Sequence, residues 1–246
     1  MARTSNHCEL LDMQTSITGK EVHLNFEYHT GDASGQNMVT FATDAICREL
    51  LAGSPVQPRR WYIEGNMSGD KKSSMQSFLY ARGKKVVAET HIPRRLIEEY
   101  IHATPEELVR CWQASLLGSM QSGSIAVQGH VANALAAIFL ACGQDVACVS
   151  EASVGLTRMD VMENGDFYAS LALPNLIVGT VGGGTRLPTA TECLEMMGCK
   201  GNDGARRFAE ICAAVALGGE ISICGALAAG HFVQAHANYG RKRKPE

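Results

Sequence analysis

The stretch VHLNFEYHTGDASGQNM, residues 22–38, changes its hydrophobic period part of the way along, and this change marks a strand that leads into a helix. Apolar and polar side chains alternate over 22–28, which is the pattern of a strand with one buried face. Gly31 interrupts the alternation, and apolar residues then recur at helical spacing. The stretch therefore predicts a strand and a helix joined by the short connection GDASG.

The helix after this connection is predicted over residues 33–51. Asp32 or Ser34 can cap its first turn, and Gly53 can close its last turn. A second strand is expected at 61–63, after a loop marked by prolines. Two or three elements in about 60 residues cannot cover both faces of a sheet, so we expect other elements or a partner chain to complete this small α+β domain.

The rest of the chain is more helical, and we place a domain boundary near Gly65. Residues 1–64 are then part of the small domain, and residues 65–246 are a large, mostly helical domain with a mixed sheet, which gives an α+β fold class. Helices are expected at 73–81, 93–103, 105–115, 127–141, 188–197, 205–216 and 220–239. Further strands are expected at 84–89, 167–173 and 176–181.

Composition excludes several classes of protein. The net charge is −3 and 46% of the 246 residues are hydrophobic, so neither nucleic-acid binding nor membrane-surface binding is predicted. The longest apolar run, 131–142, covers about 12 residues where a bilayer needs roughly 20, which indicates a buried helix and no membrane span. No targeting segment is recognisable at the start of the chain. The nine cysteines are odd in number and lack a C-x-x-C pair, which fits reduced thiols in a cytoplasmic protein.

Two glycine-containing loops have the composition of ligand loops. The segment GDASGQNM, 31–38, offers backbone N–H groups at a helix start and small residues that admit a pyrophosphate, although an ordinary capped helix explains the same residues. The segment GTVGGGT, 179–185, follows an apolar strand and precedes a helix. Its glycines do not have the Rossmann spacing, so either a tight irregular turn or a close approach to a ligand accounts for them.

Charged residues next to glycines suggest carbonyl chemistry. Within Asp70, Lys71 and Lys72, a lysine in a closed site can polarise a carbonyl oxygen and stabilise the oxyanion formed when hydride arrives, although such triplets are also common in solvated loops. Asp145 follows a very apolar helix and needs a partner such as a lysine or Asn133, unless it only caps a helix.

The last predicted helix carries two histidines, His231 and His236, which are five residues apart and so do not form an i, i+4 metal pair. Either can be a buried structural histidine, but His236 can also protonate a leaving thiolate. The basic run 241–244 follows, and Arg241 is either part of a solvated tail or a contact for a phosphate-bearing cofactor. No pattern predicts a metal site.

Six motifs in this order resemble the hydroxymethylglutaryl-CoA (HMG-CoA) reductases, specifically the class I enzymes that include the eukaryotic ones. The motifs are TSITGK at 15–20, GDASGQNM at 31–38, GNMSGDKK at 65–72, ACGQD at 141–145, LPNLIVGTVGGGTRLP at 173–188 and GALAAGHFVQAH at 225–236. The resemblance implies reduction of 3-hydroxy-3-methylglutaryl-CoA to mevalonate with two NADPH and release of coenzyme A. It also implies a ferredoxin-like small domain and sites formed between subunits of a homodimer or a higher assembly.

The resemblance also implies roles for individual residues. Lys71 would polarise the thioester and then the aldehyde carbonyl, Asp145 would be its partner, and His236 would protonate the coenzyme A thiolate. The residues that would line the nicotinamide nucleotide are Asp32, Ser34, Gly35, Gln36, Asn37, Gly182, Gly183, Gly184 and Thr185. The residues that would contact the substrate are Asp70, Lys72 and Asn133.

The sequence departs from the family pattern at several places. The upstream E-N-x-x-G segment with the catalytic glutamate and the serine-arginine contact to the NADP phosphate have no counterpart, so we expect a C-terminal catalytic portion. Glu64 stands where many members have a substrate-contacting serine, Ala114 replaces a lysine, and Lys242 replaces the serine phosphorylated in animal enzymes. Three interpretations remain open: a reductase whose full chain supplies the glutamate, one half of a split enzyme, and a non-catalytic ligand-binding or assembly subunit.

Overall fold

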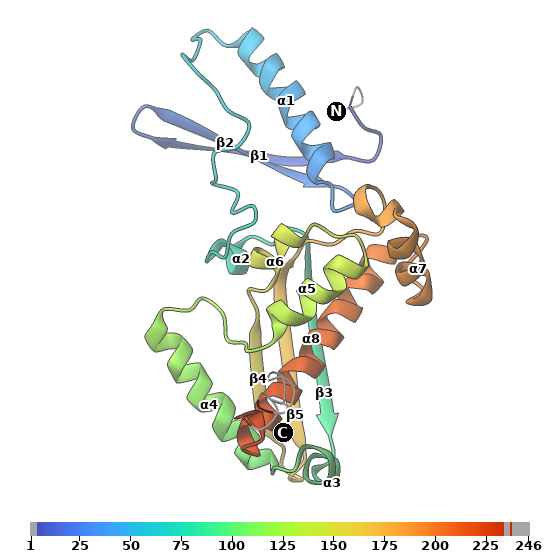
Figure 1. Cartoon of the computed structure of the whole chain (residues 1–246). Helices are drawn as coiled ribbons and strands as arrows, with labels where there is room; N and C mark the ends of the chain where they lie inside the picture. Colours follow the sequence, from blue (N-terminus) through green and yellow to red (C-terminus); the bar gives the residue numbers. More distant parts are fainter. Residues whose placement is uncertain (1–3, 234–236, 238–246) are drawn as a thin grey trace, which may run out of the picture.

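The computed structural model describes residues 4–233 and 237. Its first part, the hairpin unit, consists of β1 (Glu9–Thr18), β2 (Glu21–His29) and α1 (Gln36–Gly53). The two strands pair antiparallel to form a two-stranded sheet, and Figure 1 shows it projecting, with α1, beyond the rest of the fold. Ala42 of α1 is 1% exposed, whereas most apolar side chains of the hairpin unit remain accessible.

The second part, the core unit, spans residues 84–228 and is built on a three-stranded sheet. Its order is β3-β5-β4, with β3 at Lys84–Ile92, β5 at Phe167–Leu176 and β4 at Leu156–Val161. Both strand pairs are antiparallel, so the mixed sheet expected from the sequence is an antiparallel one; a single parallel bridge between Val127 and Leu156 lies outside the named strands. The alternating buried positions of β5 carry apolar side chains into the core, as a strand with one covered face requires.

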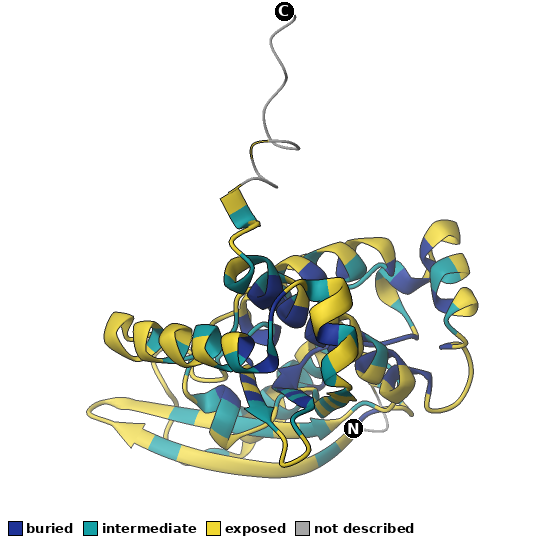
Figure 2. Cartoon of the chain, turned by 90° about the horizontal axis from the view of Figure 1, so that it is seen from below, coloured by how far each residue is buried: buried dark blue, intermediate teal, exposed yellow. Residues whose placement is uncertain are grey.

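Helices pack on this sheet, and α8 contacts β3, β5, α4 and α5. The longer helices are α4 (Pro105–Ser122), α5 (Val131–Ala141), α7 (Pro188–Met196) and α8 (Gly204–Ala228). The short ones are α2 (Gln76–Leu79), α3 (Arg94–Leu96), the π-helical η1 (Ile97–Ile101), the 3-10 turn η2 (Val146–Cys148), α6 (Val149–Ala152) and the 3-10 turn η3 (Gly183–Arg186). The buried apolar cluster lies between Ile97 and Cys224, and Figure 2 shows the hairpin unit largely exposed beside it.

Within the described residues, α8 is the one helix that is long and apolar enough to cross a membrane, by length and composition. The apolar run expected at 131–142 is therefore not the longest apolar element. Core helices pass the same test, and 44% of the most apolar stretch of α8 is buried inside this fold. Cys212, Ala213 and Ala216 are fully buried, so the apolar character of α8 is used in the core.

Several element boundaries differ from those expected. The helices expected at 205–216 and 220–239 begin as one helix, α8, because Gly219 allows close packing instead of ending the helix. A Cβ added at Gly219 would lie 2.0 Å from the His130 ring, so this position has no room for a side chain. α8 ends at Ala228, well before Tyr239, where the sequence pattern placed the end of the last helix; Tyr239 itself lies outside the described residues.

The strand pattern also needs correction. Residues 61–63 are not a strand, whereas β1 and β4 were not expected. The two strands expected at 167–173 and 176–181 are the single strand β5, which ends at Leu176. Neither Asp32 nor Ser34 caps α1 with its side chain; Gly35 stands at the cap position with φ 80°, a conformation that glycine adopts without strain.

Candidate active site

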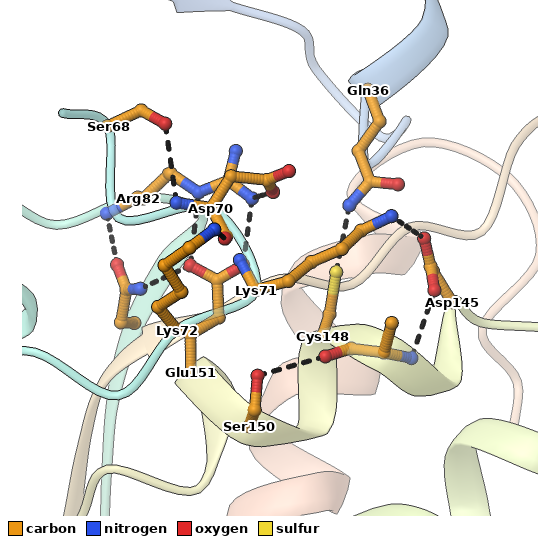
Figure 3. A network of polar contacts seen from close by, with 12 residues as sticks. Gln36, Ser68, Asp70, Lys71, Lys72, Arg82, Asp145, Cys148, Ser150 and Glu151 are labelled. Atoms are coloured by element: carbon orange, nitrogen blue, oxygen red, sulfur yellow. Dashed lines mark hydrogen bonds and ion pairs between the residues drawn. The ribbon is translucent and has the colours of Figure 1, made fainter. Parts of the chain in front are cut away.

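An ion pair between Lys71 and Asp145 lies at the centre of the candidate site, where the loop that follows the hairpin unit meets the end of α5 (Figure 3). The Lys71 Nζ atom is 2.9 Å from the Asp145 Oδ2 atom. Asp145 precedes η2 and also accepts a hydrogen bond from the backbone N–H of Ala147 at 3.0 Å. The contact between the lysine and the aspartate, expected from the family resemblance, is present.

The contact between Lys71 and Asp145 favours the charged form of both side chains. The hydrogen bond to Asp145 raises the pKa of Lys71, and the same bond lowers the pKa of Asp145. The two side chains are 39% and 36% exposed, so an approaching ligand can reach them. An ammonium held in this way can donate a hydrogen bond to an oxygen that gains negative charge.

A buried charged network that the sequence did not reveal lies under this pair. Glu151 on α6 is 1% exposed, and its carboxylate accepts two hydrogen bonds from Arg82 and one from the Asn175 side chain. Asp70 also pairs with Arg82, and the backbone N–H of Arg82 donates to the Asn175 side chain. Burial is the largest single influence and would lower the pKa of the Arg82 guanidinium, but the bonds to Glu151 and the negative charges of Glu151 and Asp70 together keep that pKa above its ordinary value.

The three expected substrate contacts occupy different places. Asp70 is engaged with Arg82, whereas the Lys72 ammonium donates to the backbone oxygen of Asp70 at 2.9 Å and stays exposed. Asn133 is exposed on the first turn of α5. Because a helix rises 1.5 Å per residue, Asn133 lies about 12 Å along the axis from the end of α5 that leads to Asp145.

The loop 31–38 joins the two units. The Asp32 carboxylate accepts hydrogen bonds from the backbone N–H groups of Asp203 at 3.1 Å and Ala205 at 3.0 Å, so it caps the start of α8. Its backbone oxygen accepts from Thr180 at 2.8 Å. Asp32 therefore connects the hairpin unit to the longest helix of the core unit. The sequence did not predict this role, because the bonded groups are 171 and 173 residues away along the chain.

Gln36, at the start of α1, contacts the short helical turn that follows Asp145. Its side-chain amide donates to the thiol sulfur of Cys148, three residues after Asp145 (Figure 3). Burial raises the pKa of the Cys148 thiol to about 12, so this sulfur is a neutral acceptor. Gly35 is buried, and Ser34 and Asn37 are exposed.

The glycine loop 179–185 combines close chain crossings with open backbone. A Cβ at Gly179 would lie 2.3 Å from the Ser34 nitrogen, and one at Gly184 would lie 2.4 Å from the Gly143 oxygen. Gly182 and Gly183, with φ 80° and 53°, have open space where a side chain would stand. Thr185 is 5% exposed. Close chain crossings therefore explain Gly179 and Gly184, whereas a ligand can approach the backbone at Gly182 and Gly183.

The remaining expected residues are placed as follows. His236, Arg241 and Lys242 lie outside the described residues. His231 packs edge-to-face on His102, with ring centroids 6.0 Å apart. Glu64 and Ala114 are exposed, and in residues 4–233 and 237 no group of three or more His, Cys, Asp or Glu side chains could hold a metal ion.

Comparison with known sequences gives consistent matches. The family model described as hydroxymethylglutaryl-coenzyme A reductase matches residues 1–241. The 3-hydroxy-3-methylglutaryl-coenzyme A reductase of Pyrococcus abyssi is 41% identical over 247 residues, covering 98% of this chain and 60% of that protein. The Haloferax volcanii reductase is 41% identical, with 97% and 60% covered, and the Fusarium fujikuroi reductase is 38% identical, with 98% and 26% covered. The chain thus spans about 60% of the length of the archaeal relatives.

A solved structure has the same fold. The class II 3-hydroxy-3-methylglutaryl-CoA reductase from Streptococcus pneumoniae, bound to NADPH in open conformations, matches with a TM-score of 0.66. The match has 20% sequence identity and covers 89% of this chain and 59% of that chain. This similarity confirms the α+β fold class expected from the sequence.

Proposed function

The chain belongs to the hydroxymethylglutaryl-coenzyme A reductase family, as its motifs predict, and on this premise we propose that it takes part in the NADPH-dependent reduction of HMG-CoA to mevalonate and coenzyme A. In this proposal, residues 1–64 belong to the nucleotide-binding domain and residues 65–246 to the substrate domain. The observation that carries this proposal is the Lys71–Asp145 pair, 2.9 Å apart and partly exposed, in a chain of this family.

Lys71 is proposed to stabilise the oxygen of the carbonyl group that is reduced. When hydride arrives at the carbonyl carbon, negative charge develops on the oxygen, and a charged donor already in place stabilises it. The raised pKa of Lys71 keeps its ammonium charged through neutral pH. Asp145 orients that ammonium, and the same arrangement can act on the thioester and then on the aldehyde.

NADPH is the hydride donor in this proposal, and residues of two loops fit a nicotinamide nucleotide. Among the described residues, no side chain caps the start of α1, so its backbone N–H groups and helix dipole are available to a phosphate. Gly182 and Gly183 leave the backbone open to close approach. We assign the nucleotide contacts to the following residues: Asp32, Ser34, Gly35, Gln36, Asn37, Gly182, Gly183, Gly184, Thr185 and Arg241.

The substrate contacts and the second proton donor complete the proposal. Lys72 is an exposed cation next to Lys71, which suits the carboxylate of the acyl group, and Asp70 and Asn133 are the other proposed contacts. His236 is proposed to protonate the departing coenzyme A thiolate. Reduction of mevaldehyde needs no such proton, which separates the role of His236 from that of Lys71.

A homodimer or a higher homo-oligomer in the cytoplasm is the proposed state. The accessible surface of the chain is 15446 Å², whereas a compact monomer of this mass exposes about 10,600 Å². This excess, together with the exposed apolar side chains of the hairpin unit, leaves surface that a second copy can cover. The free state of all nine thiols suits a reducing compartment.

A second candidate function is a split-enzyme or non-catalytic subunit of a reductase-like assembly. It is favoured by one observation: the carboxylates of Asp70, Asp145 and Glu151, which lie around Lys71, are each already paired with a cation. A proton-donating glutamate would then come from another segment or another polypeptide.

Loss of NADPH absorbance tests these alternatives. The purified chain is given HMG-CoA, and mevaldehyde with coenzyme A is tested in parallel. Oxidation matched by mevalonate formation supports a complete catalyst. If oxidation requires an added polypeptide that carries an E-N-x-x-G segment, a reductase completed by that segment is supported, whether the segment belongs to the full chain or to a second polypeptide. No oxidation by a folded chain in either case supports the non-catalytic subunit.

A further inference from the structure

We propose that Glu151 is a positioning residue that holds Lys71 in place from beneath, through the backbone of Lys71 itself. This inference deepens the proposed function and rests on it for the catalytic meaning of Lys71. Nothing in the sequence motifs distinguishes Glu151, because it lies between the ACGQD segment and β4 without a glycine or a charged neighbour. Its role follows from contacts that join four separate segments of the chain.

The two carboxylate oxygens of Glu151 are each used twice. Oε1 accepts from the Lys71 backbone N–H at 3.0 Å and from Arg82 Nη2 at 2.8 Å. Oε2 accepts from Arg82 Nε at 3.1 Å and from Asn175 Nδ2 at 3.0 Å. A carboxylate that is 1% exposed and bonded to four donors is held in one orientation.

Lys71 needs such an anchor because its backbone conformation is unfavourable. Its φ is 56°, in the left-handed region that residues with a Cβ rarely adopt. A conformation of this kind persists when surrounding contacts hold it, and it is common at active sites. The bond from the Lys71 N–H to Glu151 is a contact that ties this turn to the buried part of the fold.

One short helical segment, η2–α6, therefore contacts both the side-chain ammonium and the backbone N–H of Lys71. Asp145, at the start of the η2–α6 segment, binds the ammonium, and Glu151, within α6, binds the backbone N–H (Figure 3). A change in the turn would move the ammonium relative to Asp145. Glu151 cannot itself donate a proton to a substrate, because it is buried and its oxygens are occupied, so its effect on the reaction passes through Lys71.

The test measures the reactivity of the Lys71 amine and needs no substrate. An amine-acylating reagent is applied at several pH values, and mass spectrometry compares labelling of Lys71 with labelling of the exposed Lys20 in the same molecules. In Glu151→Gln, the weakened hold of Asp145 on Lys71 should shift the labelling profile of Lys71 to lower pH. Since partly exposed ion pairs are weak, labelling near pH 9 should rise about two- to fivefold.

Glu106→Gln is the matched control. Glu106 also binds an arginine, Arg94, through two hydrogen bonds, but at a surface site on α4. This variant should leave the Lys71 profile unchanged. Unchanged Lys71 labelling in a folded Glu151→Gln protein would overturn the proposal.

Arg82→Lys covers the case in which Glu151→Gln does not fold. It keeps the positive charge but loses the two-pronged contact with Glu151, so Lys71 labelling should change in the same direction and by less. An unchanged profile in this variant, too, counts against a positioning role. Because labelling requires neither NADPH nor HMG-CoA, a chain with shifted labelling and no reductase activity would contradict the proposed function alone.

Discussion

The hairpin unit and the core unit differ in how many of their large apolar side chains are buried. In the core unit, Phe139, Phe167 and Phe208 are fully buried. In the hairpin unit, Ile17 is 72% exposed and Phe41 is 67% exposed. The core unit therefore stabilises itself, whereas the hairpin unit presents apolar surface that a further segment or a second molecule can cover.

The candidate active site lies at the boundary between these two units, where polar contacts take the place of a shared core. Asp32 caps α8, and Gln36 bonds to Cys148. A boundary held by a few directed bonds can move without unfolding either unit. Such a boundary is suited to a site that must admit and release large ligands.

The largest expected difference between the two units is in the unfolding free energy lost by Phe208→Ala and by Phe41→Ala. Removing the fully buried ring should cost about 3 to 5 kcal/mol of unfolding free energy, because it leaves a cavity in the core. Removing the exposed ring should change stability by no more than about 0.5 kcal/mol. Urea unfolding followed by circular dichroism measures both. Equal losses would mean that Phe41 is already covered, for example by a second copy, and would break the comparison.

Lys71→Ala tests the catalytic role of the site at the boundary between the two units. It should lower kcat for HMG-CoA reduction in a complete assembly by about 100- to 1,000-fold, because it removes the donor to the developing oxyanion. The melting temperature should stay close to that of the parent, since the Lys71 side chain is 39% exposed. Lys20→Ala, at the exposed hairpin turn, is the control. Near-normal turnover by Lys71→Ala would remove the central assignment.

The sequence predicted the Lys71–Asp145 pair, but it did not predict the charged network of Glu151 and Arg82 beneath that pair. The periodicity of 22–51 located β2 and α1, and the family motifs paired Lys71 with Asp145. The charged network was out of reach, because Glu151 is 69 residues from Arg82 along the chain and its burial depends on that partner. A local pattern carries no information on such a long-range pairing.

Two strands were missed for a different physical reason. β1 carries a bulge between Leu10 and Asp12, and it faces solvent on both sides, so no clean alternation develops. β4 covers Leu156–Val161 and includes the exposed ion pair Arg158–Asp160. Both strands are defined by pairing with a neighbour, and their own composition shows it poorly.

Asp32→Ala is expected to have a moderate effect on the joint between the units. Loss of the cap on α8 should lower stability by about 0.5 to 2 kcal/mol in the absence of any nucleotide. The hydrogen-exchange rates of the backbone amides in the first turn of α8 should also rise. Asp12→Ala is the control, because the Asp12 carboxylate accepts hydrogen bonds from its neighbours Met13 and Gln14 on exposed β1. If both variants behave alike, the Asp32 cap does not join the units.

The smallest effect concerns the pH dependence of the Lys71–Asp145 pair. The folded pKa of Asp145 is lowered, so its contribution is present above its ordinary value of 3.8 and is lost as pH falls through the folded value. The folded pKa of Lys71 is raised, so its contribution is present below its ordinary value of 10.5 and is lost as pH rises through the folded value. Between these limits the pair should add a constant amount.

That amount is expected to be only about 0.2 to 1 kcal/mol, because both side chains are more than one third exposed. The unfolding free energies of the parent and of Asp145→Asn, measured from pH 3 to pH 11, should differ by a plateau that shrinks at both ends. A difference that instead keeps growing across neutral pH would indicate a titrating partner other than Lys71. In that case, the boundary between the units would hold a charge that the contacts of Lys71 and Asp145 do not explain.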